Sequence, residues 1–434
     1  MPLRLIEYAS SADWPAIDSW LSRRDAAENN VEPLVRDILK EVKERGDEAV
    51  AEYTRRFDCP DMIEHRLIVS TDHIRQALDQ IPTLDLEIIA EAAANIRDFH
   101  QRQKQNSWIT TPAAGTTLGQ LVLPVDRAGL YVPGGQGGET PLISSLLMNA
   151  IPAQVAGVKT LCVVSPPRRD GTLNPYILAT AAIIGIEHIF LCGSAWAIAA
   201  LAYGTQSIPR VDVIAGPGNI FVTTAKRLLV GQVGIDMIAG PSEIAILADS
   251  SANPAWLAAD MLSQAEHDPL ASSILVSPDR NLLDAVRQEL ELQLPLLPRS
   301  DLATQSLTNW SALIHVSDLA TGMELINLLA PEHFELSVAD PWAMIGMVRN
   351  AGAVFMGHAT PEPVGDYFAG PNHVLPTLST ARFSSALSVE TFCKKTSLLC
   401  TDQAYLQQHG AKIARLARLE GLEAHARSVE QRLG

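Results

Sequence analysis

Apolar residues occur at helical spacing through the first part of the chain, up to about residue 110. In residues 32–44 and 84–103 they recur three and four positions apart among charged residues. That period predicts amphipathic helices, each with one apolar face. This region contains no cluster of residues that suggests chemistry.

From about Gly119 the pattern changes to short β-branched runs separated by helical segments. The alternation of such runs with helices predicts parallel sheets that are covered on both faces. The sequence therefore predicts an α/β fold. The expected strands are residues 121–124, 160–164, 188–192, 211–215, 244–248, 274–276, 313–316 and 353–356.

The sheet pattern ends after about Arg382, and residues 402–433 are typical of two helices interrupted at Gly410 and Gly421. A tail of this length has little room for a core of its own. We therefore expect it to pack on something else, and a second subunit is the natural candidate.

Glycine clusters follow two expected strands, at carboxyl ends where parallel sheets commonly bind ligands. One cluster, from Gly134 to Gly138, precedes a helix expected over residues 141–156, with Gly157 as its stop. The other, Gly216-Pro217-Gly218-Asn219, opens a helix expected over residues 220–229, whose free N–H groups could receive an anion. Neither cluster matches the dinucleotide fingerprint or a P-loop, so tight turns and phosphate contacts both stay open.

Composition and charge narrow the function classes. The chain has 434 residues, 47% of them hydrophobic and 19% charged, and about two or three domains are expected at this length. The lack of a long apolar run and of a secretory signal predicts a cytoplasmic protein without a membrane segment. The net charge of −16 argues against a nucleic-acid partner. The five cysteines include no Cys-x-x-Cys pair, so neither a thiolate zinc site nor a disulfide framework is indicated.

One helix is expected to begin at Asn253 and to stop before Pro269. Gln264 and His267 lie three residues apart in its last turn, so an amide oxygen and an imidazole nitrogen share one face. The two could converge on a metal ion. A polar helix end with a capping histidine explains the same pattern, so both interpretations stay open here.

Further segments carry side chains that bind metals or move protons. Glu332 and His333 are neighbours in a loop expected over residues 330–336, and such a pair can divide acid and base roles. Asp366 and His373 lie on a stiff loop rich in Gly and Pro. Each candidate also has a simpler interpretation. The segment of Glu332 and His333 could be a solvated loop, Ser242 could cap a turn, and Glu420 and His425 could be helix positions that face water. The remaining candidates are Ser242, Glu420, His425 and the competing ligand His358.

Taken together and in order, these segments resemble the histidinol dehydrogenase family, the zinc- and NAD-dependent enzymes of the last step of histidine biosynthesis. The resemblance runs from about residue 30 to the C-terminus. It rests on Tyr131-Val132-Pro133-Gly134-Gly135, Gly216-Pro217-Gly218-Asn219, Ala239-Gly240-Pro241-Ser242-Glu243, Gln264-x-x-His267, Pro331-Glu332-His333-Phe334-Glu335, Gly370-Pro371-Asn372-His373 and Glu420-Gly421-Leu422-Glu423-Ala424-His425.

The resemblance implies a four-electron oxidation of L-histidinol, through L-histidinaldehyde, to L-histidine with NAD. It implies Glu332 and His333 as acid–base residues, and one Zn²⁺ per subunit. Two imidazoles, a carboxylate and an amide oxygen are a donor set suited to zinc. The implied metal ligands are Gln264, His267, Asp366 and His425; substrate contacts come from Ser242, Gln264, His267, His333, Asp366, His373, Glu420 and His425, and NAD contacts from Tyr131, Asn219 and the position of Trp196.

The resemblance also implies two incomplete Rossmann-like parallel-sheet domains with helical N- and C-terminal arms. We expect an N-terminal helical arm over residues 1–26, and a main α/β domain with the metal and catalytic residues over 27–128 and 245–385. The second α/β domain, on the NAD side, is expected over 129–244, and the C-terminal helical tail over 386–434. The family is a homodimer in which the tail of one subunit completes the other's site, which would explain the tail.

Two departures from the family pattern lie on the cofactor side. Trp196 stands where the family commonly has Gln, and a Trp offers a stacking face and an N–H but no acceptor. The loop over residues 136–141 also differs from the small-residue and Tyr-Pro segment of the family. We therefore expect the chemistry to be kept and the hold on NAD to differ.

Three other functions fit parts of the sequence. A paralogue with the same machinery would oxidise another small alcohol or diol to its acid. A thiolate mechanism would use Cys192 to attack the aldehyde, although Cys192 follows an apolar run and is typical of a buried residue. A non-catalytic zinc-binding or interaction protein would keep the fold and lose an acid–base residue, whereas Glu332 and His333 are both present.

Overall fold

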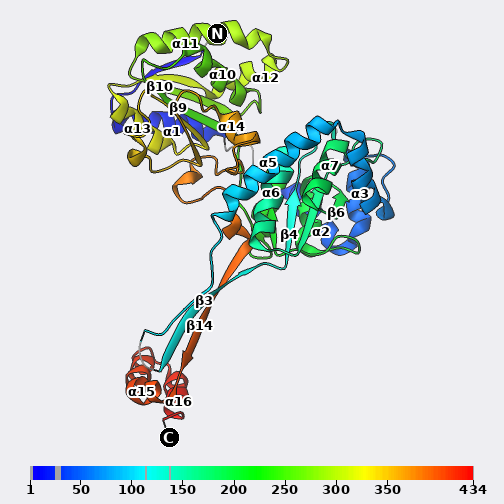
Figure 1. Cartoon of the computed structure of the whole chain (residues 1–434), viewed down its shortest axis with the longest axis vertical. Helices are drawn as coiled ribbons and strands as arrows, with labels where there is room; N and C mark the ends of the chain where they lie inside the picture. The colour runs from blue at the N-terminus through cyan, green and yellow to red at the C-terminus, as the bar shows by residue number, and fades with distance from the viewer. Residues whose placement is uncertain (1–2, 25–30, 113–114, 136–137, 434) are drawn as a thin grey trace.

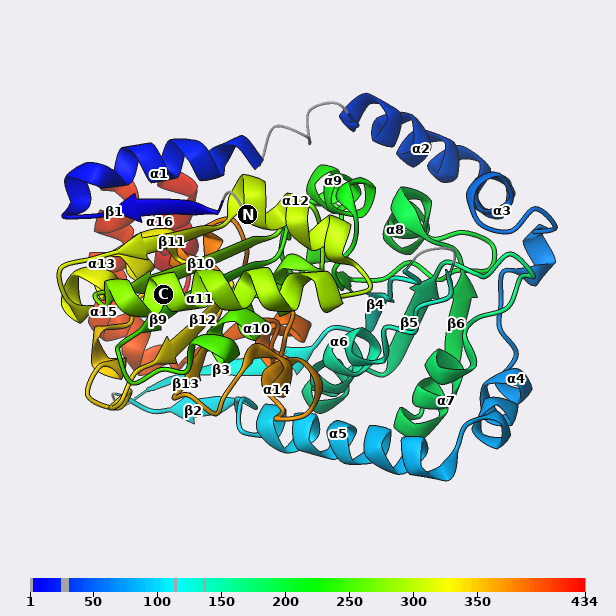
Figure 2. The same cartoon turned by 90° about the horizontal axis from the view of Figure 1, so that it is seen from above.

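Two α/β lobes and a projecting arm make up the chain (Figure 1). The computed structural model describes residues 3–24, 31–112, 115–135 and 138–433. Seen from above, the two lobes lie side by side, and each sheet is covered by helices (Figure 2). The expected class, two parallel-sheet domains with arms, is confirmed.

The first lobe is built on a six-stranded sheet in which every neighbouring pair is parallel. Its strands, in spatial order, are β1 (Arg4–Glu7), β11 (Ala312–His315), β10 (Ser272–Ser277), β9 (Glu243–Ala248), β12 (His333–Ser337) and β13 (Ala353–Met356). Because β1 joins the sheet edge, the N-terminal segment is not the purely helical arm that was expected.

Helices cover both faces of this sheet. They are α1 (Trp14–Leu21), α10 (Pro254–Ala265), α11 (Arg280–Gln293), α12 (Ser300–Trp310), α13 (Leu319–Leu329) and α14 (Glu362–Tyr367). Alternate residues of β9 point to opposite faces. Ile244 and Ile246 pack with Leu257 of α10, while Ala245 and Leu247 pack with Ile326 of α13. The predicted helix start at Asn253 is confirmed, since its side chain accepts from the Ala255 N–H.

The second lobe carries a five-stranded parallel sheet. Its strands are β6 (His188–Leu191), β5 (Thr160–Ser165), β4 (Arg127–Tyr131), β7 (Val213–Ala215) and β8 (Gly234–Ile235). Its helices are α6 (Ile143–Ala156), α7 (Pro175–Ile184), α8 (Ser194–Tyr203) and α9 (Ile220–Leu229). The expected helix stop at Gly157 is confirmed by its left-handed backbone, with φ of 95°.

The N-terminal helices belong to this second lobe and not, as expected, to the first. They are α2 (Glu32–Arg45), α3 (Asp47–Phe57), α4 (Thr71–Gln76) and α5 (Thr83–Gln101). Val35, Val50 and Ile96 from these helices share one core with Val163 of β5. Their apolar faces were visible in the sequence, but an apolar stripe does not say which sheet it covers.

The arm is an antiparallel ribbon that ends in two helices (Figure 1). It consists of β2 (Trp108–Thr110), β3 (Thr116–Pro124), β14 (Cys393–Thr401), α15 (Gln403–Leu419) and α16 (Glu423–Glu430). The strand expected at 121–124 is therefore part of a ribbon and not of a parallel sheet, and the tail is not wholly helical. Helix α15 continues through Gly410, whereas Gly421, with φ of 78°, separates the two helices.

Short 3₁₀ turns complete the chain, at Ser11–Asp13, Glu64–Arg66, Ala77–Gln80, Leu294–Leu296, Ile345–Met347, Thr380–Arg382 and Val389–Phe392. Within the described residues, each helix is too short or too polar to cross a membrane.

Candidate active site

The candidate acid–base residues lie at the amino end of one strand of the six-stranded sheet, next to the amino end of its neighbour. Glu332 directly precedes β12, His333 begins that strand, and Glu243 begins β9 beside it. The segment around Glu332 was expected to be a loop. That expectation was wrong, because buried polar partners allow this charged segment to form a central strand.

His333 is held by a backbone carbonyl. Its Nδ1 lies 3.0 Å from the Glu243 carbonyl oxygen, and a carbonyl only accepts, so Nδ1 carries the proton. Nε2 lies 3.8 Å from Asp366 Oδ1 and 3.8 Å from Glu362 Oε1. The second ring nitrogen therefore faces the group of carboxylates.

Burial and charge shift the titration of this pair. Burial raises the pKa of Glu332 to about 8, against the attraction of His333. Burial alone would lower the pKa of His333, but Glu332, Glu362 and Asp366 outweigh it and raise the pKa to about 10. Adjacent groups with such displaced pKa values are typical of catalytic sites.

A group of metal-binding side chains lies beside this pair. Candidate ligand atoms of His267, Glu362 and Asp366 all lie within 4.8 Å of one another. His267 Nδ1 lies 2.9 Å from the Ser263 carbonyl oxygen, so this nitrogen carries the proton and Nε2 keeps a lone pair for a metal. The arrangement fits a divalent cation.

Gln264 supplies a second sign of a metal. Its side chain is fully buried at the end of α10. Among the described residues, neither its amide oxygen nor its amide nitrogen has a hydrogen-bond partner. Such an orphaned amide is costly unless a ligand completes it. The oxygen of Gln264 therefore suits the zinc ligand role that the resemblance implied.

Glu362 was missed in the sequence. It begins α14, four residues before Asp366, so both carboxylates lie on one face of the helix. Its backbone N–H donates to Glu335 Oε1 at 2.9 Å, and burial raises the pKa of Glu362. Burial also raises the pKa of Asp260, which faces Glu335, to about 6. The i, i+4 spacing of Glu362 and Asp366 was the available signal.

A cavity of about 310 Å³ adjoins the metal group. Its lining includes Asp366 and His373, with apolar walls from Phe99, Phe355 and Leu375. Burial lowers the pKa of His373, and its Nε2 lacks a hydrogen-bond partner within the described part of the chain. An apolar cavity with a few polar groups is typical of a small-molecule site.

Ser242 also lies at this edge of the sheet, because it directly precedes Glu243. Its carbonyl accepts from the Ser272 N–H at 3.1 Å. Competing His358 is occupied elsewhere, since Nδ1 lies 2.8 Å from Ser337 Oγ and Nε2 lies 3.1 Å from Ser251 Oγ. Ser242, Gln264, His267, Glu332, His333 and Asp366 thus come from the first lobe. His373 instead lies in a segment that contacts the second lobe, since the neighbouring Asn372 donates to the Met148 carbonyl of α6 and Val374 belongs to that lobe's core.

Glu420 and His425 lie elsewhere in the same chain. Both line a hollow on the helices at the end of the arm, with Leu416 and Leu422. The arm projects away from both lobes (Figure 1). One chain therefore does not bring these two residues to the metal group.

The expected cofactor residues lie at the carboxyl end of the second sheet. Tyr131 ends β4, and its hydroxyl accepts from the Ser194 N–H at 3.2 Å. Asn219 caps α9 by accepting from the Phe221 and Val222 N–H groups. A buried ion pair of Lys226 and Asp236 holds Gly216 at the preceding turn. Gln136 and Gly137 lie outside the described residues.

Trp196 is buried in the second lobe. Its ring stacks on Tyr53 and Phe57 of α3, with centroids 5.7 and 5.6 Å apart. Its Nε1 donates to Thr54 Oγ1 at 3.1 Å. These contacts give the indole a packing role in the lobe.

Cys192 lies in a similar apolar setting, fully buried, and burial raises the pKa of its thiol. A neutral buried thiol is a poor nucleophile. The thiolate mechanism therefore lacks support from this environment.

Comparison with known proteins gives a consistent result. The sequence model of the family described as histidinol dehydrogenase matches residues 21–433. Histidinol dehydrogenases of Oleidesulfovibrio alaskensis and Nitratidesulfovibrio vulgaris are 63% and 60% identical to the chain, each match covering 100% of this chain and 100% and 99% of the relative. The crystal structure of histidinol dehydrogenase from Elizabethkingia anophelis matches with a TM-score of 0.91 at 35% identity, covering 99% of this chain and 98% of that chain. This chain therefore belongs to the histidinol dehydrogenase family.

Proposed function

We propose that this protein oxidises L-histidinol to L-histidine, through L-histidinaldehyde, with two NAD and one zinc ion per site. Family membership supports the substrate. The observation that carries the proposal is the fully buried amide of Gln264, which has no hydrogen-bond partner among the described residues and lies beside the converging His267 and Asp366. A cytoplasmic location, and the absence of nucleic-acid or membrane partners, remain predictions.

The metal ligands in this proposal are Gln264, His267 and Asp366 of one subunit and the partner's His425. When bound, zinc would polarise the substrate hydroxyl, and its charge would favour ionised Glu332 and neutral His333. The Ser263 carbonyl orients His267 so that its Nε2 is the donor atom.

His333 acts as the base of the first oxidation. Its Nδ1 keeps its proton and donates it to the Glu243 carbonyl, which leaves Nε2 as the basic nitrogen. Nε2 takes the hydroxyl proton of histidinol while the carbinol carbon gives its hydride to NAD. The C–O single bond becomes the carbonyl of histidinaldehyde.

Glu332 acts in the second oxidation. Its carboxylate takes a proton from water as the water oxygen bonds to the aldehyde carbon. The resulting hydrate gives its hydride to a second NAD and loses a further proton, which leaves the carboxylate of histidine. The two hydrides account for the four electrons.

His373, which lines the cavity beside the metal group, holds the substrate together with Ser242 and the partner's Glu420. His373 is buried and its lowered pKa keeps it neutral, so its ring can exchange a hydrogen bond with the substrate. The apolar walls exclude water from an aldehyde that must stay bound between two oxidations.

A homodimer is part of the proposal. Leu399, Leu416 and Leu419 of the arm are between 63% and 73% exposed, which is a large apolar surface for a projecting element. If the arm crosses to a second copy, these leucines become buried and Glu420 and His425 reach the partner's metal group. The site then contains residues of both subunits.

The test is the amount of NADH formed per L-histidinol consumed, before zinc removal, after chelation and after zinc is restored. About two NADH per substrate, lost and regained with the metal, would support a four-electron, zinc-dependent oxidation. Zinc-loaded protein that forms NADH from another amino alcohol or diol, and none from histidinol, would instead support the paralogue.

A further inference from the structure

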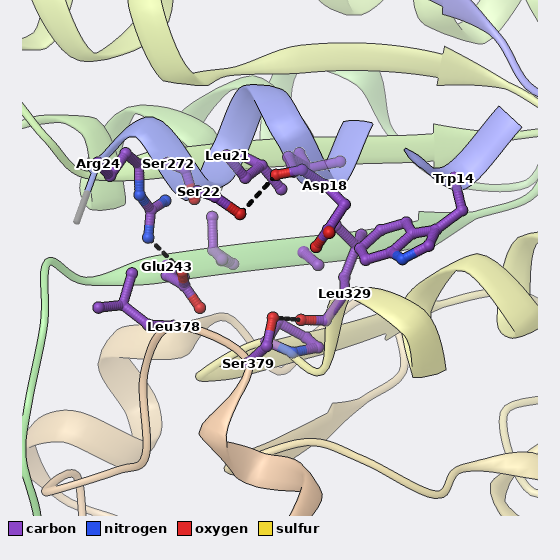
Figure 3. A pocket seen from close by; sticks show the side chains of 14 residues that line it. Trp14, Asp18, Leu21, Ser22, Arg24, Glu243, Ser272, Leu329, Leu378 and Ser379 are labelled. Atoms are coloured by element: carbon purple, nitrogen blue, oxygen red, sulfur yellow. Dashed lines mark hydrogen bonds and ion pairs between the residues drawn. The ribbon is translucent and has the colours of Figure 1, made fainter. Parts of the chain in front are cut away.

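A buried ion pair lies directly behind the acid–base residues. Arg24 follows α1, and only 3% of its surface is exposed. Its guanidinium pairs with the carboxylate of Glu243 across a small pocket that α1 residues and β9 line together (Figure 3). The N-terminal segment therefore reaches the edge of the sheet where the acid–base residues lie.

The backbone of Glu243 contacts both acid–base residues. Its N–H donates to Glu332 Oε2 at 2.9 Å, and its carbonyl accepts from His333 Nδ1 at 3.0 Å. One peptide segment thus orients the carboxylate and fixes the proton of the imidazole. A shift of Glu243 would displace both groups together.

The residues before Glu243 are held by backbone contacts of their own, and the Glu243 side chain is held by its ion pair with Arg24. The Gly240 N–H donates to Thr377 Oγ1, and the Ser272 N–H donates to the Ser242 carbonyl, so the preceding residues are held independently. The Glu243 side chain is only 12% exposed. Removing Arg24 would leave a poorly solvated, unpaired carboxylate, which would draw the segment toward water.

We propose that Arg24 is a positioning residue for catalysis, which acts through Glu243 on Glu332 and His333. This inference rests on the proposed function, because its effect is measured on histidinol oxidation. Arg24 touches none of the reacting atoms. Its role is to keep the Glu243 peptide where it orients the two acid–base side chains.

The experiment compares Arg24→Met, Arg24→Lys, and the double variant Arg24→Met with Glu243→Gln, using the zinc-loaded protein. Arg24→Met should lower kcat about tenfold or more, since misplaced catalytic groups cost at least that much. The KM values for histidinol and NAD should change less than about twofold, because binding residues are untouched. Arg24→Lys should restore part of kcat.

The double variant separates charge pairing from simple packing. It removes both buried charges, so it should recover kcat relative to Arg24→Met, although it lacks more native contacts. Arg23→Met is the matched control, since Arg23 is an exposed neighbour in the same turn and should keep wild-type kinetics. All assays use conditions under which circular dichroism shows that each variant is folded.

A wild-type kcat in folded Arg24→Met would overturn the inference, as would a loss confined to KM. A double variant with no more activity than Arg24→Met would also overturn it, since the loss would not come from the unpaired charge. Wild-type protein in the same assay tests the proposed function separately. If wild type oxidises histidinol and the Arg24 variants have the same kcat, this inference is wrong while the proposed function is still supported.

Discussion

Replacing Trp196 with Phe distinguishes a packing residue from a cofactor contact. Trp196 occupies a position where the family commonly has a Gln that helps to bind NAD, so the family resemblance alone implied a position near the cofactor. In the structure its indole stacks on Tyr53 and Phe57 and donates to Thr54. We therefore expect the substitution to change stability and to leave NAD binding nearly unchanged.

The magnitude follows from these contacts. Phe keeps an aromatic ring for stacking, but the fully buried Thr54 hydroxyl loses its donor partner. An unsatisfied buried hydroxyl and a small cavity together should cost about 2 kcal/mol. Trp196→Ala also loses both stacked contacts, so the cost should rise to about 4 kcal/mol.

The assay is urea unfolding of each variant, combined with the KM for NAD at saturating histidinol. Trp342→Phe is the matched control, because Trp342 is 75% exposed and its loss should change stability by less than about 0.5 kcal/mol. Trp196→Phe should lower the urea midpoint and keep the KM within about twofold of wild type. Unchanged stability with a strongly raised KM for NAD would refute the reasoning and assign the indole to the cofactor.

Three further predictions concern the metal, the water and a buried acid. His267→Asn should lose tight zinc binding while keeping the fold, and stoichiometric zinc in that folded variant by metal analysis would contradict the assigned ligand. Glu332→Gln should slow oxidation of added histidinaldehyde more than that of histidinol in single-turnover assays; equal losses would remove Glu332 as the residue that activates water. Burial raises the pKa of Asp58 to about 7, above its unfolded value of about 3.9, so ionisation destabilises the fold and stability falls as pH rises between these values. Asp58→Asn should therefore gain about 4 kcal/mol over wild type at pH 8 and nothing at pH 4, and an equal change at both pH values would contradict the assignment.

Most of the fold could be predicted from the sequence, because the strands of its parallel sheets are short apolar runs. Short apolar runs marked strands such as β5 and β9, and Gly157 marked a helix end. β12 was not predicted as a strand, because Glu332, His333 and Glu335 give this segment the composition of a loop. Each of these side chains is buried with a partner from another element, and such partners are not visible in one segment.

The candidate site was readable only through its motifs. Gln264 and His267 carried a local spacing, and Asp366 gained meaning from the family resemblance. Glu362 had the right spacing to Asp366 but stands between two prolines, which drew attention to the turn. Arg24 had no local signal at all, because its partner Glu243 lies more than 200 residues away in the chain.

The placement of the arm was also beyond a local pattern. The sequence predicted two tail helices with Glu420 and His425 on them, but the ribbon that carries them pairs β3 with β14, two strands that lie far apart in the sequence. Pairing over such a separation depends on tertiary contacts rather than on propensity. The exposed leucines of the arm form an apolar surface that a second subunit would bury in the proposed dimer.

The measurement that tests the central claim most directly is complementation between two inactive variants, His267→Asn and His425→Ala. The two proteins are unfolded together, refolded as an equal mixture and assayed for NADH formation from histidinol with zinc present. If the site joins the lobe of one subunit to the arm of its partner, mixed dimers contain one intact site, and about a quarter of wild-type activity should return. A mixture that stays as inactive as either variant alone would contradict the shared site.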